Sequence, residues 1–428
     1  MDFTQNNRLE QITDETLIIG IDVAKHKHVA RAIDDRGRDL AKRLVFESGL
    51  TGFKELLDWT QNLSEETNRP DLIFGMEPTG HYWLNLAYYL TAQELHAVVV
   101  NPTKVNRTKE LDDDSPTKND TKDAKVIAQV VRAGRYHDPI LPEGIYAELR
   151  EGMKLHDMMQ KDLSSIKAQV QNALDRYFPE FTSVFKDWTK KTPIHFLKKG
   201  YLPADIASCS EEELMVEVKV AAKRGVGIKR VRALKHAAET SVGLTVGLAM
   251  ARQEISYLID QYLAIEERIE AHEARLEELV RQVPGASQMI AIKGIGVMTV
   301  AGFFAEVGDL SNYKDPRQII KLAGYNLQLN QSGIFKGQTT ITKRGRRRLR
   351  SILYLAARPL SANNEGFKQL HHYYKNRANN PLTGKESFVA LGRKLIKIFY
   401  VMGTRNCVFD GKRMMRDIPQ LKSLQEAA

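Results

Sequence analysis

Cysteine and long apolar runs are both scarce in this chain of 428 residues. The two cysteines, Cys209 and Cys407, have no CxxC or CxxH spacing, which excludes a zinc module and gives no disulfide framework, so a reducing cytoplasm is expected. No run approaches the ~18 apolar residues of a membrane span, and the N-terminus lacks a basic start followed by an apolar core. The sequence predicts a soluble protein that is not exported.

Acidic residues are fewer than basic ones. The chain has 63 Lys and Arg against 53 Asp and Glu, which gives a formal net charge of +10 and a pI near 9.3. This excess indicates a polyanionic partner, and nucleic acid is the expected one. The length is sufficient for two or three domains, each with its own core.

Two carboxylates stand where the sequence otherwise predicts buried strands. Asp22 lies inside the apolar run at residues 17–25, where an unpaired carboxylate is costly. Glu77 ends the apolar run at residues 71–77, just before a Pro-Thr-Gly breaker, so it is expected at a strand tip. Taken singly, each acid also fits a hydrogen-bonded or solvated carboxylate.

Two further acids, Asp120 and Asp123, lie three residues apart in a segment of helical period and therefore share one face of a helix. Asp123 alone also fits an ion pair with Lys122 or Lys125. As a set, the four acids repel one another unless a cation is present, and hard oxygen donors suit Mg²⁺ or Mn²⁺ better than zinc. Two such ions, roughly 3.5–4 Å apart, would hold the attacking and leaving oxygens of a phosphodiester.

The order of the expected elements supports a nuclease-like fold. Strands are expected at 17–25, 28–34, 43–48, 71–77 and 96–101, and helices at about 50–63, at about 81–93 and from Asp120 onward. Three consecutive strands, then alternating helices and strands, with acids on the first strand, the fourth strand and a late helix, are the layout of an α/β domain of the RNase H or RuvC type.

The middle of the chain predicts long helices with coiled-coil spacing. One 3-4 repeat comprises Ile255, Leu258, Tyr262, Ile265, Ile269, His272, Leu276, Leu279 and Val283, and a shorter one comprises Met159, Leu163, Ile166, Val170, Ala173 and Tyr177. The two helices could pair with each other or with another copy, and a plain antiparallel hairpin remains open. The basic cluster at 221–237 fits a nucleic acid contact or a solvated helix face.

From about residue 284 the sequence predicts a mainly helical region with two further features. Lys293, Gly294 and Gly296 form a turn like that of a helix-hairpin-helix motif, in which backbone N–H groups approach phosphate. A tight turn between packed helices is the alternative. The predicted helix at 385–402 is apolar on one face and is expected to complete the core.

Ser332 lies in a polar Asn-Gln-Ser-Gly stretch followed by cations. These cations are Lys336, Lys343, Arg344, Arg346, Arg347, Arg348 and Arg350. An activated serine hydroxyl with nearby positive charge suits phosphoryl transfer, and six cations within residues 343–350 favour phosphate contact. From the local sequence alone, Ser332 also fits a simple turn.

Several motifs together resemble one family. GIDVAK, MEPTG, NDTKDA, QSG and TKRGRRRLR are similar to motifs of the DEDD transposases of bacterial insertion sequences, which include the Piv-type invertases and some bridge-RNA-guided recombinases. The resemblance runs nearly end to end and is strongest at about 17–135 and 284–402. Residues 178–246 match little. Gln331 stands where many relatives have a second serine, which leaves Ser332 as the candidate hydroxyl of the motif.

The resemblance implies a bacterial, cytoplasmic transposase that acts as a DNA recombinase. It implies a RuvC-like DEDD domain at 1–140, a coiled-coil and linker region at 141–283, and a transposase domain at 284–428 that carries the nucleophile Ser332. It further implies a homo-oligomer, either a dimer or a tetramer, a site shared between subunits, a covalent phosphoserine and a structured guide RNA. Two alternatives are a RuvC-like Holliday-junction nuclease that uses water, and a non-catalytic nucleic-acid-binding protein.

Overall fold

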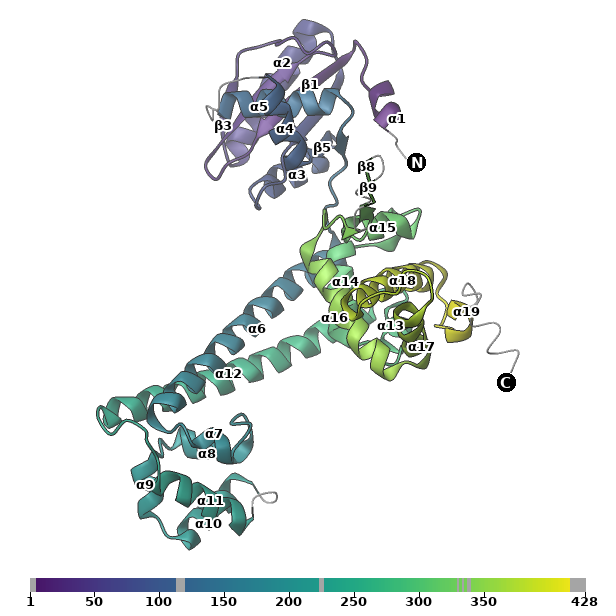
Figure 1. The fold of residues 1–428 in the computed structure, drawn as a ribbon. Coiled ribbons are helices and arrows are strands. Elements are labelled where there is room, and N and C mark those ends of the chain that lie inside the picture. The colour runs from purple at the N-terminus through teal and green to yellow at the C-terminus, as the bar shows by residue number, and fades with distance from the viewer. Residues whose placement is uncertain are drawn as a thin grey trace. The chain divides into compact units, whose positions relative to one another are not determined.

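The computed structural model describes residues 5–112, 120–222, 227–328, 331–332, 335–336 and 340–415. It divides into two compact units, Met1–Leu141 and Pro142–Ala428. The first unit is mixed α/β and the second is mostly helical, as the sequence predicts (Figure 1). Within the described ranges, no helix is both long and apolar enough to cross a membrane.

The N-terminal unit is built on one mixed sheet. Its described strands are β1 (Thr16–Asp22), β2 (Lys27–Ile33), β3 (Leu44–Glu47), β4 (Asp71–Met76), β5 (His96–Val100) and β6 (Tyr136–His137), in the order β3-β2-β1-β4-β5-β6. β1 pairs antiparallel with β2 and parallel with β4, and β4 pairs parallel with β5. β1 is buried up to its last residue, because its continuous apolar run faces a core on both sides of the sheet.

Helices cover both faces of this sheet. They are α2 (Leu50–Thr67), α3 (Trp83–Ala92), α4 (Pro102–Asp112) and α5 (Asp120–Arg132), and a short helix, α1 (Gln5–Glu10), precedes β1. On one face, α2 and α3 pack on alternate strand residues such as Ile19 and Ile21. On the other face, α4 and α5 pack on the intervening residues, such as Ile18 and Ile73. This alternation assigns each strand side chain to one of the two cores.

Two helices of 34 residues each, α6 (Gly144–Tyr177) and α12 (Leu248–Arg281), form the backbone of the second unit. They pack side by side and antiparallel (Figure 1). Near one end Nε2 of His272 donates to the carbonyl oxygen of Gly152 at 2.8 Å, and near the other Arg176 pairs with Glu254 at 2.8 Å. The predicted helices therefore pair with each other within one chain, and His272 is an interior polar residue.

A small helical module, here called the tip module (residues 178–247), joins these two helices. It contains α7 (Phe181–Val184), α8 (Lys191–Lys198), α9 (Pro203–Ser208), α10 (Glu211–Ala221) and α11 (Ile228–Glu239). One hydrophobic cluster links the module to the last turns of α6 and the first turns of α12. The sequence alone predicts no fold for most of this segment.

The rest of the second unit packs around α14, α16 and α18. The elements are α13 (Ala286–Ile290), α14 (Val297–Val307), the 3-10 helix η1 (Leu310–Asn312), α15 (Pro316–Leu322), the short strands β7 (Leu327–Gln328), β8 (Gln331–Ser332), β9 (Phe335–Lys336) and β10 (Thr340–Ile341), then α16 (Arg347–Asn363), α17 (Glu365–Asn376), α18 (Gly384–Arg405) and α19 (Gly411–Met415). The apolar face of α18 contacts α16 and α15, in agreement with the expected core helix.

Candidate active site

The register of the sheet sets Asp22 and Glu77 beside each other. Ile21 of β1 pairs with Met76 of β4 in parallel register, and the next step along these strands leads to Asp22 and Glu77. Neighbouring strands lie about 4.8 Å apart, and paired residues of parallel strands point to the same face. Both half-buried acids therefore leave the sheet together at the carboxyl ends of adjacent strands.

The face that carries these acids is the one that α5 covers. Gly20 and Gly75 precede the two acids by two residues and so lie on the same face. A Cβ atom at Gly20 would lie 2.1 Å from the Ala124 carbonyl oxygen, and one at Gly75 would lie 2.5 Å from Cγ2 of Val131. Glycine at both positions is what permits α5 to pack so closely on β1 and β4.

The direction of α5 brings its first turn to the same end of the sheet. Arg132, at the end of α5, donates from Nη1 to the carbonyl oxygen of Arg36 at 2.6 Å, in the turn after β2. Because β1 and β2 are antiparallel, that turn lies beside the start of β1. The first turn of α5, with Asp120 and Asp123, consequently lies near the ends of β1 and β4.

A lysine from α4 occupies this region together with Asp123. Nζ of Lys109 lies 2.7 Å from Oδ2 of Asp123, whose side chain is 14% exposed. Of the partners suggested by the sequence, Lys125 instead contacts Asp39 at 2.8 Å. Lys109 is not recognisable as a site residue from the sequence, because a single lysine in the polar helix α4 follows no pattern and only the fold brings it to Asp123.

Local contacts fix the chain where β1 and β4 end. Oγ1 of Thr79 donates to Oε1 of Glu77 at 2.6 Å, in a turn where Gly80 has a φ of +67°. After β1, the N–H of Ala24 donates to Nδ1 of His28 at 3.2 Å, and the His28 side chain is fully buried. Burial lowers the pKa of His28, so its imidazole stays neutral and can accept this hydrogen bond.

The donor set at this end of the sheet fits a hard cation. Its candidate ligands are all carboxylates, and the ammonium group of Lys109 already neutralises one of them. Among the described side chains, no three acids, histidines or cysteines form a group that could hold a metal ion. The side chain of Asp120 lies outside that part of the structure, so the predicted set of four cannot be assembled from described residues alone.

Ser332 lies in a small antiparallel pair of strands. Ser332 of β8 pairs with Phe335 of β9, and Gln331 pairs with Lys336. A second antiparallel pair flanks the first in the sequence: β7, which precedes β8, pairs with β10, which follows β9. The side chains of Ser332 and Lys336 lie outside the described part, so the backbone pairing is what the structure gives for this predicted site.

The six cations of the predicted phosphate-binding run fall into two groups. Lys343, Arg344 and Arg347 are exposed, and no ion pair is recorded for them within the described ranges. The other three are half-buried and face protein groups. Nη1 of Arg350, for example, donates to the carbonyl oxygen of Ala323 at 3.0 Å.

The remaining inward cations connect α16 to other helices. Nη1 of Arg346 donates to the carbonyl oxygen of Glu306, and burial lowers the pKa of Arg346. Arg348 contacts the Asp157 carboxylate, lies 3.3 Å from Oε1 of Glu306, and donates to the carbonyl oxygen of Met153 at 2.7 Å. These contacts hold the first turn of α16 against α6 and α14. The partner acids were not foreseen, because they lie far away in the sequence.

The glycine turn at 293–296 joins α13 to α14, and its two glycines differ in the space around them. Gly294 has a φ of +97°, and a Cβ atom there would lie 2.9 Å from the carbonyl oxygen of Pro359 in α16. Packing therefore explains Gly294. Gly296 precedes the first turn of α14 with open space beside it, and Lys293 is exposed. Those two remain accessible for the predicted phosphate contact.

Comparison with known protein families finds a match in each unit. A DEDD transposase model of IS110, described as a transposase, matches residues 19–179, and a model described as the transposase IS116/IS110/IS902 family matches residues 286–375. The chain belongs to this family of transposases. The first match contains all four acids, and the second contains Ser332 and the basic run. This transposase is therefore an enzyme that acts on DNA.

Full-length relatives agree with this assignment. The transposase is 25% identical to the insertion element IS116 uncharacterized 44.8 kDa protein of Streptomyces clavuligerus, over 90% of this chain and 94% of that protein. It is 25% identical to the mini-circle putative transposase for IS117 of Streptomyces coelicolor, over 72% and 76% of the two chains. It is 28% identical to the transposase for insertion sequence element IS1328 of Yersinia enterocolitica, over 46% and 57%.

Proposed function

We propose that this transposase cuts and rejoins DNA with a metal site formed by Asp22, Glu77, Asp120 and Asp123 and with Ser332 as nucleophile. The observation that carries the proposal is the in-register placement of Asp22 and Glu77 on the face covered by α5. The first turn of α5 supplies the other two acids. The strand order β3-β2-β1-β4-β5 supports an RNase H or RuvC-like domain at residues 1–140.

Bound Mg²⁺ or Mn²⁺ would supply positive charge to the oxygens of the reacting phosphodiester. Carboxylates of the chain would hold the metal ion in place. Asp22 and Glu77 would offer oxygens from two fixed strand ends, and Asp123 from the first turn of α5. Thr79 would orient the Glu77 carboxylate through its hydrogen bond of 2.6 Å. Lys109 would hold Asp123 while no cation is bound, because its ammonium group neutralises the same carboxylate.

Ser332 would attack the phosphorus atom through Oγ and displace a deoxyribose hydroxyl, which leaves with a proton. The serine–phosphate ester keeps the energy of the broken bond, so a second hydroxyl can attack it and reform a phosphodiester without ATP. The exposed cations Lys343, Arg344 and Arg347 would stabilise the negative charge that develops on the phosphate. Lys336 is a further candidate for this role.

The partners beyond DNA follow the family resemblance. A structured guide RNA, a dimer or tetramer, and a site composed of the acids of one subunit and the serine of another are parts of the same proposal. On this basis residues 141–283 act as a helical coiled-coil spacer, and residues 284–428 form the transposase domain. Sequencing the RNA that co-purifies with the protein tests the guide directly, since a single enriched RNA species is expected.

The decisive experiment compares Ser332→Ala with Ser351→Ala, which changes an exposed serine on α16. Labelled donor DNA is incubated with each variant and Mg²⁺, and retention of label on the protein is measured in a denaturing gel. We expect Ser332→Ala to bind DNA without forming an adduct or a recombinant, while Ser351→Ala behaves as the wild type. Cleavage by Ser332→Ala at the wild-type rate, with no adduct in either protein, would instead indicate a junction nuclease that uses water.

A further inference from the structure

The tip module lies between the two regions that resemble the transposase family. The family matches end at residue 179 and resume at residue 286, so most of the module belongs to neither. It is nevertheless well packed, because α7 to α11 share one hydrophobic cluster with α6 and α12. A segment that folds this completely, outside the parts assigned to catalysis, is a candidate for a separate binding task.

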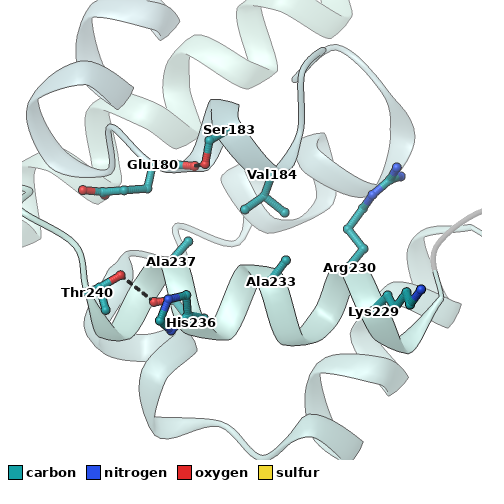
Figure 2. Close-up of a pocket in the computed structure, with 9 residues that line it drawn as sticks. All are labelled: Glu180, Ser183, Val184, Lys229, Arg230, Ala233, His236, Ala237 and Thr240. Carbon is teal, nitrogen blue, oxygen red and sulfur yellow. Dashed lines mark hydrogen bonds between the residues drawn. The ribbon is translucent and has the colours of Figure 1, made fainter.

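A groove of about 500 Å³ runs between α7 and α11 in this module (Figure 2). One face of α11 forms its long wall, with Lys229 and Arg230 at one end and His236 at the other. Ala233 lies between them and Ala237 lies beside His236, and the small, exposed side chain of Ala233 leaves the middle of the helix open to a ligand. The groove is thus long and shallow, which suits an extended chain better than a compact small molecule.

The cations of α11 differ in whether they contact other protein groups, and this depends on the face of the helix on which they lie. Away from the groove, Arg232 pairs with Glu211 at 2.9 Å, and Nζ of Lys235 donates to the carbonyl oxygen of Cys209 at 2.5 Å. On the groove face, Lys229 and Arg230 are exposed, and no acidic partner is recorded for either within the described ranges. Within the part of the chain that the structure describes, the cations outside the groove therefore have protein partners, whereas no ion pair involves Lys229 or Arg230.

The one carboxylate among the lining residues does not supply that counter-charge. Oε2 of Glu180 accepts a hydrogen bond from Oγ of Ser241 at 2.5 Å, and Oε1 accepts one from the N–H of Val242 at 3.0 Å. In Figure 2 Glu180 lies at the end of the groove away from Lys229 and Arg230. The first turn of α11 adds the positive end of the helix dipole beside these two cations.

We propose that this groove binds the sugar-phosphate backbone of a nucleic acid strand. Uncompensated cations and a helix N-terminus favour phosphate, and the alanine floor permits close approach of a strand. The lining residues include no phenylalanine, tyrosine or tryptophan, so the proposal assigns the main contact to the backbone and not to the base sequence. RNA and DNA share this chemistry. The proposal is independent of the catalytic roles of the acids and Ser332.

Charge removal in the groove tests the proposal in the full-length protein. Lys229→Gln combined with Arg230→Gln removes two groove cations. Lys191→Gln combined with Lys219→Gln is the matched control, because it removes two exposed lysines of the same module, from α8 and α10, outside the groove. Binding of a labelled 20-nucleotide single-stranded RNA, and of DNA of the same sequence, is measured by fluorescence anisotropy at several salt concentrations.

We expect the groove variant to bind about tenfold more weakly at 0.1 M salt, and the control pair less than twofold more weakly. The slope of log K against log salt should become shallower by about 1.4 for the groove variant, since each phosphate contact with a single strand contributes about 0.7. A loss confined to RNA or to DNA supports the proposal and identifies the strand. Unchanged affinity, or an equal loss in the control pair, would overturn it.

A second variant tests the shape of the groove without changing its charge. Ala233→Leu places an exposed apolar side chain on the groove floor, where a strand would have to pass. Leucine keeps the helix propensity of this position close to that of alanine, so circular dichroism should be unchanged. We expect at least a threefold loss of affinity. Wild-type affinity for both probes would show that no strand lies over the alanine floor.

Discussion

The acids of the N-terminal unit and the serine of the second unit are positioned in different ways. Asp22 and Glu77 lie at the ends of long, paired strands inside a sheet with a core on each face. Ser332 lies in a pair of two-residue strands, and the basic run that follows it in the sequence leads into a helix whose first turn is held by arginine contacts. Backbone register therefore fixes Asp22 and Glu77, whereas side-chain contacts between distant segments hold the helix that follows Ser332.

The largest expected effect tests whether the sheet-held acids carry the chemistry. Asp22→Asn should reduce Mg²⁺-dependent DNA cleavage by roughly 10²–10³-fold or more, because a neutral amide binds the cation poorly. The thermal midpoint should be unchanged or slightly raised, since one repulsive charge is removed. Asp71→Asn, at the start of β4, is the control and should cleave normally. Full activity of Asp22→Asn, or of the wild type in EDTA, would contradict the proposed metal site.

A second prediction tests the side-chain support of α16 with two neighbouring arginines. Arg348→Ala removes contacts with Asp157, Glu306 and the Met153 carbonyl, so we expect the free energy of unfolding of the second unit to fall by about 1–3 kcal/mol. Arg347→Ala removes an exposed cation and should change it by less than about 0.5 kcal/mol. Urea unfolding measures both.

The same pair of variants should respond differently in a binding assay. Arg347→Ala is expected to weaken DNA binding uniformly across sequences and to lower its salt dependence, because it removes one phosphate contact. If Arg347→Ala destabilised the protein as much as Arg348→Ala, the division of these cations into outward and inward groups would not describe the folded protein.

A third, smaller effect concerns the lysine at the acid cluster. Lys109→Met should tighten Mg²⁺ binding by about threefold, because the ammonium group that competes for Asp123 is lost and such pairs contribute at most about 1 kcal/mol. Isothermal titration calorimetry measures the affinity, with Lys54→Met, an exposed lysine on α2, as the control. Weaker binding by Lys109→Met would indicate that Lys109 orients Asp123 for the ion instead of competing with it.

The smallest effect is a pH dependence of the N-terminal unit. Burial lowers the pKa of His28 in the folded state, so below a pH of about 6.5 the unfolded state binds more protons. The unfolding free energy should therefore fall as pH is lowered from 7 to 5, and His28→Phe should flatten this dependence. Trp188→Phe restricts the fluorescence signal to Trp59 and Trp83, both in this unit. An equally steep pH dependence in His28→Phe would exclude His28 as its source.

The contrast between the two sites also explains how much the sequence could predict. Strand alternation and breakers placed β1 to β5 and α5 within a few residues, because these signals are local. The pairing of Asp22 with Glu77 follows from that order. The inward direction of Arg346 and Arg348 could not be predicted, since their partners Asp157 and Glu306 are close only after folding. A run of cations in a sequence does not show which of them face solvent.

The tip module shows a second kind of limit. Its helices are short, and their apolar residues form a core only together with α6 and α12, so no single segment carries a strong period. The basic cluster at 221–237 was ambiguous for a related reason. Arg232 and Lys235 turned out to contact the protein, whereas Lys229 and Arg230 face a groove. Whether a cation contacts the protein or faces the groove depends on which side of α11 faces the neighbouring helices. A single sequence does not give that orientation.

The equal lengths of α6 and α12 have a consequence for the size of a bound complex. At 1.5 Å per residue, 34 residues span about 50 Å. A duplex rises about 3.4 Å per base pair, so the same distance corresponds to roughly 15 base pairs of DNA lying parallel to the helices. The helix pair thus fixes the distance between its two ends. If nucleic acid contacted both ends, a footprint would show two separate protected stretches, with a spacing set by the number of helical turns.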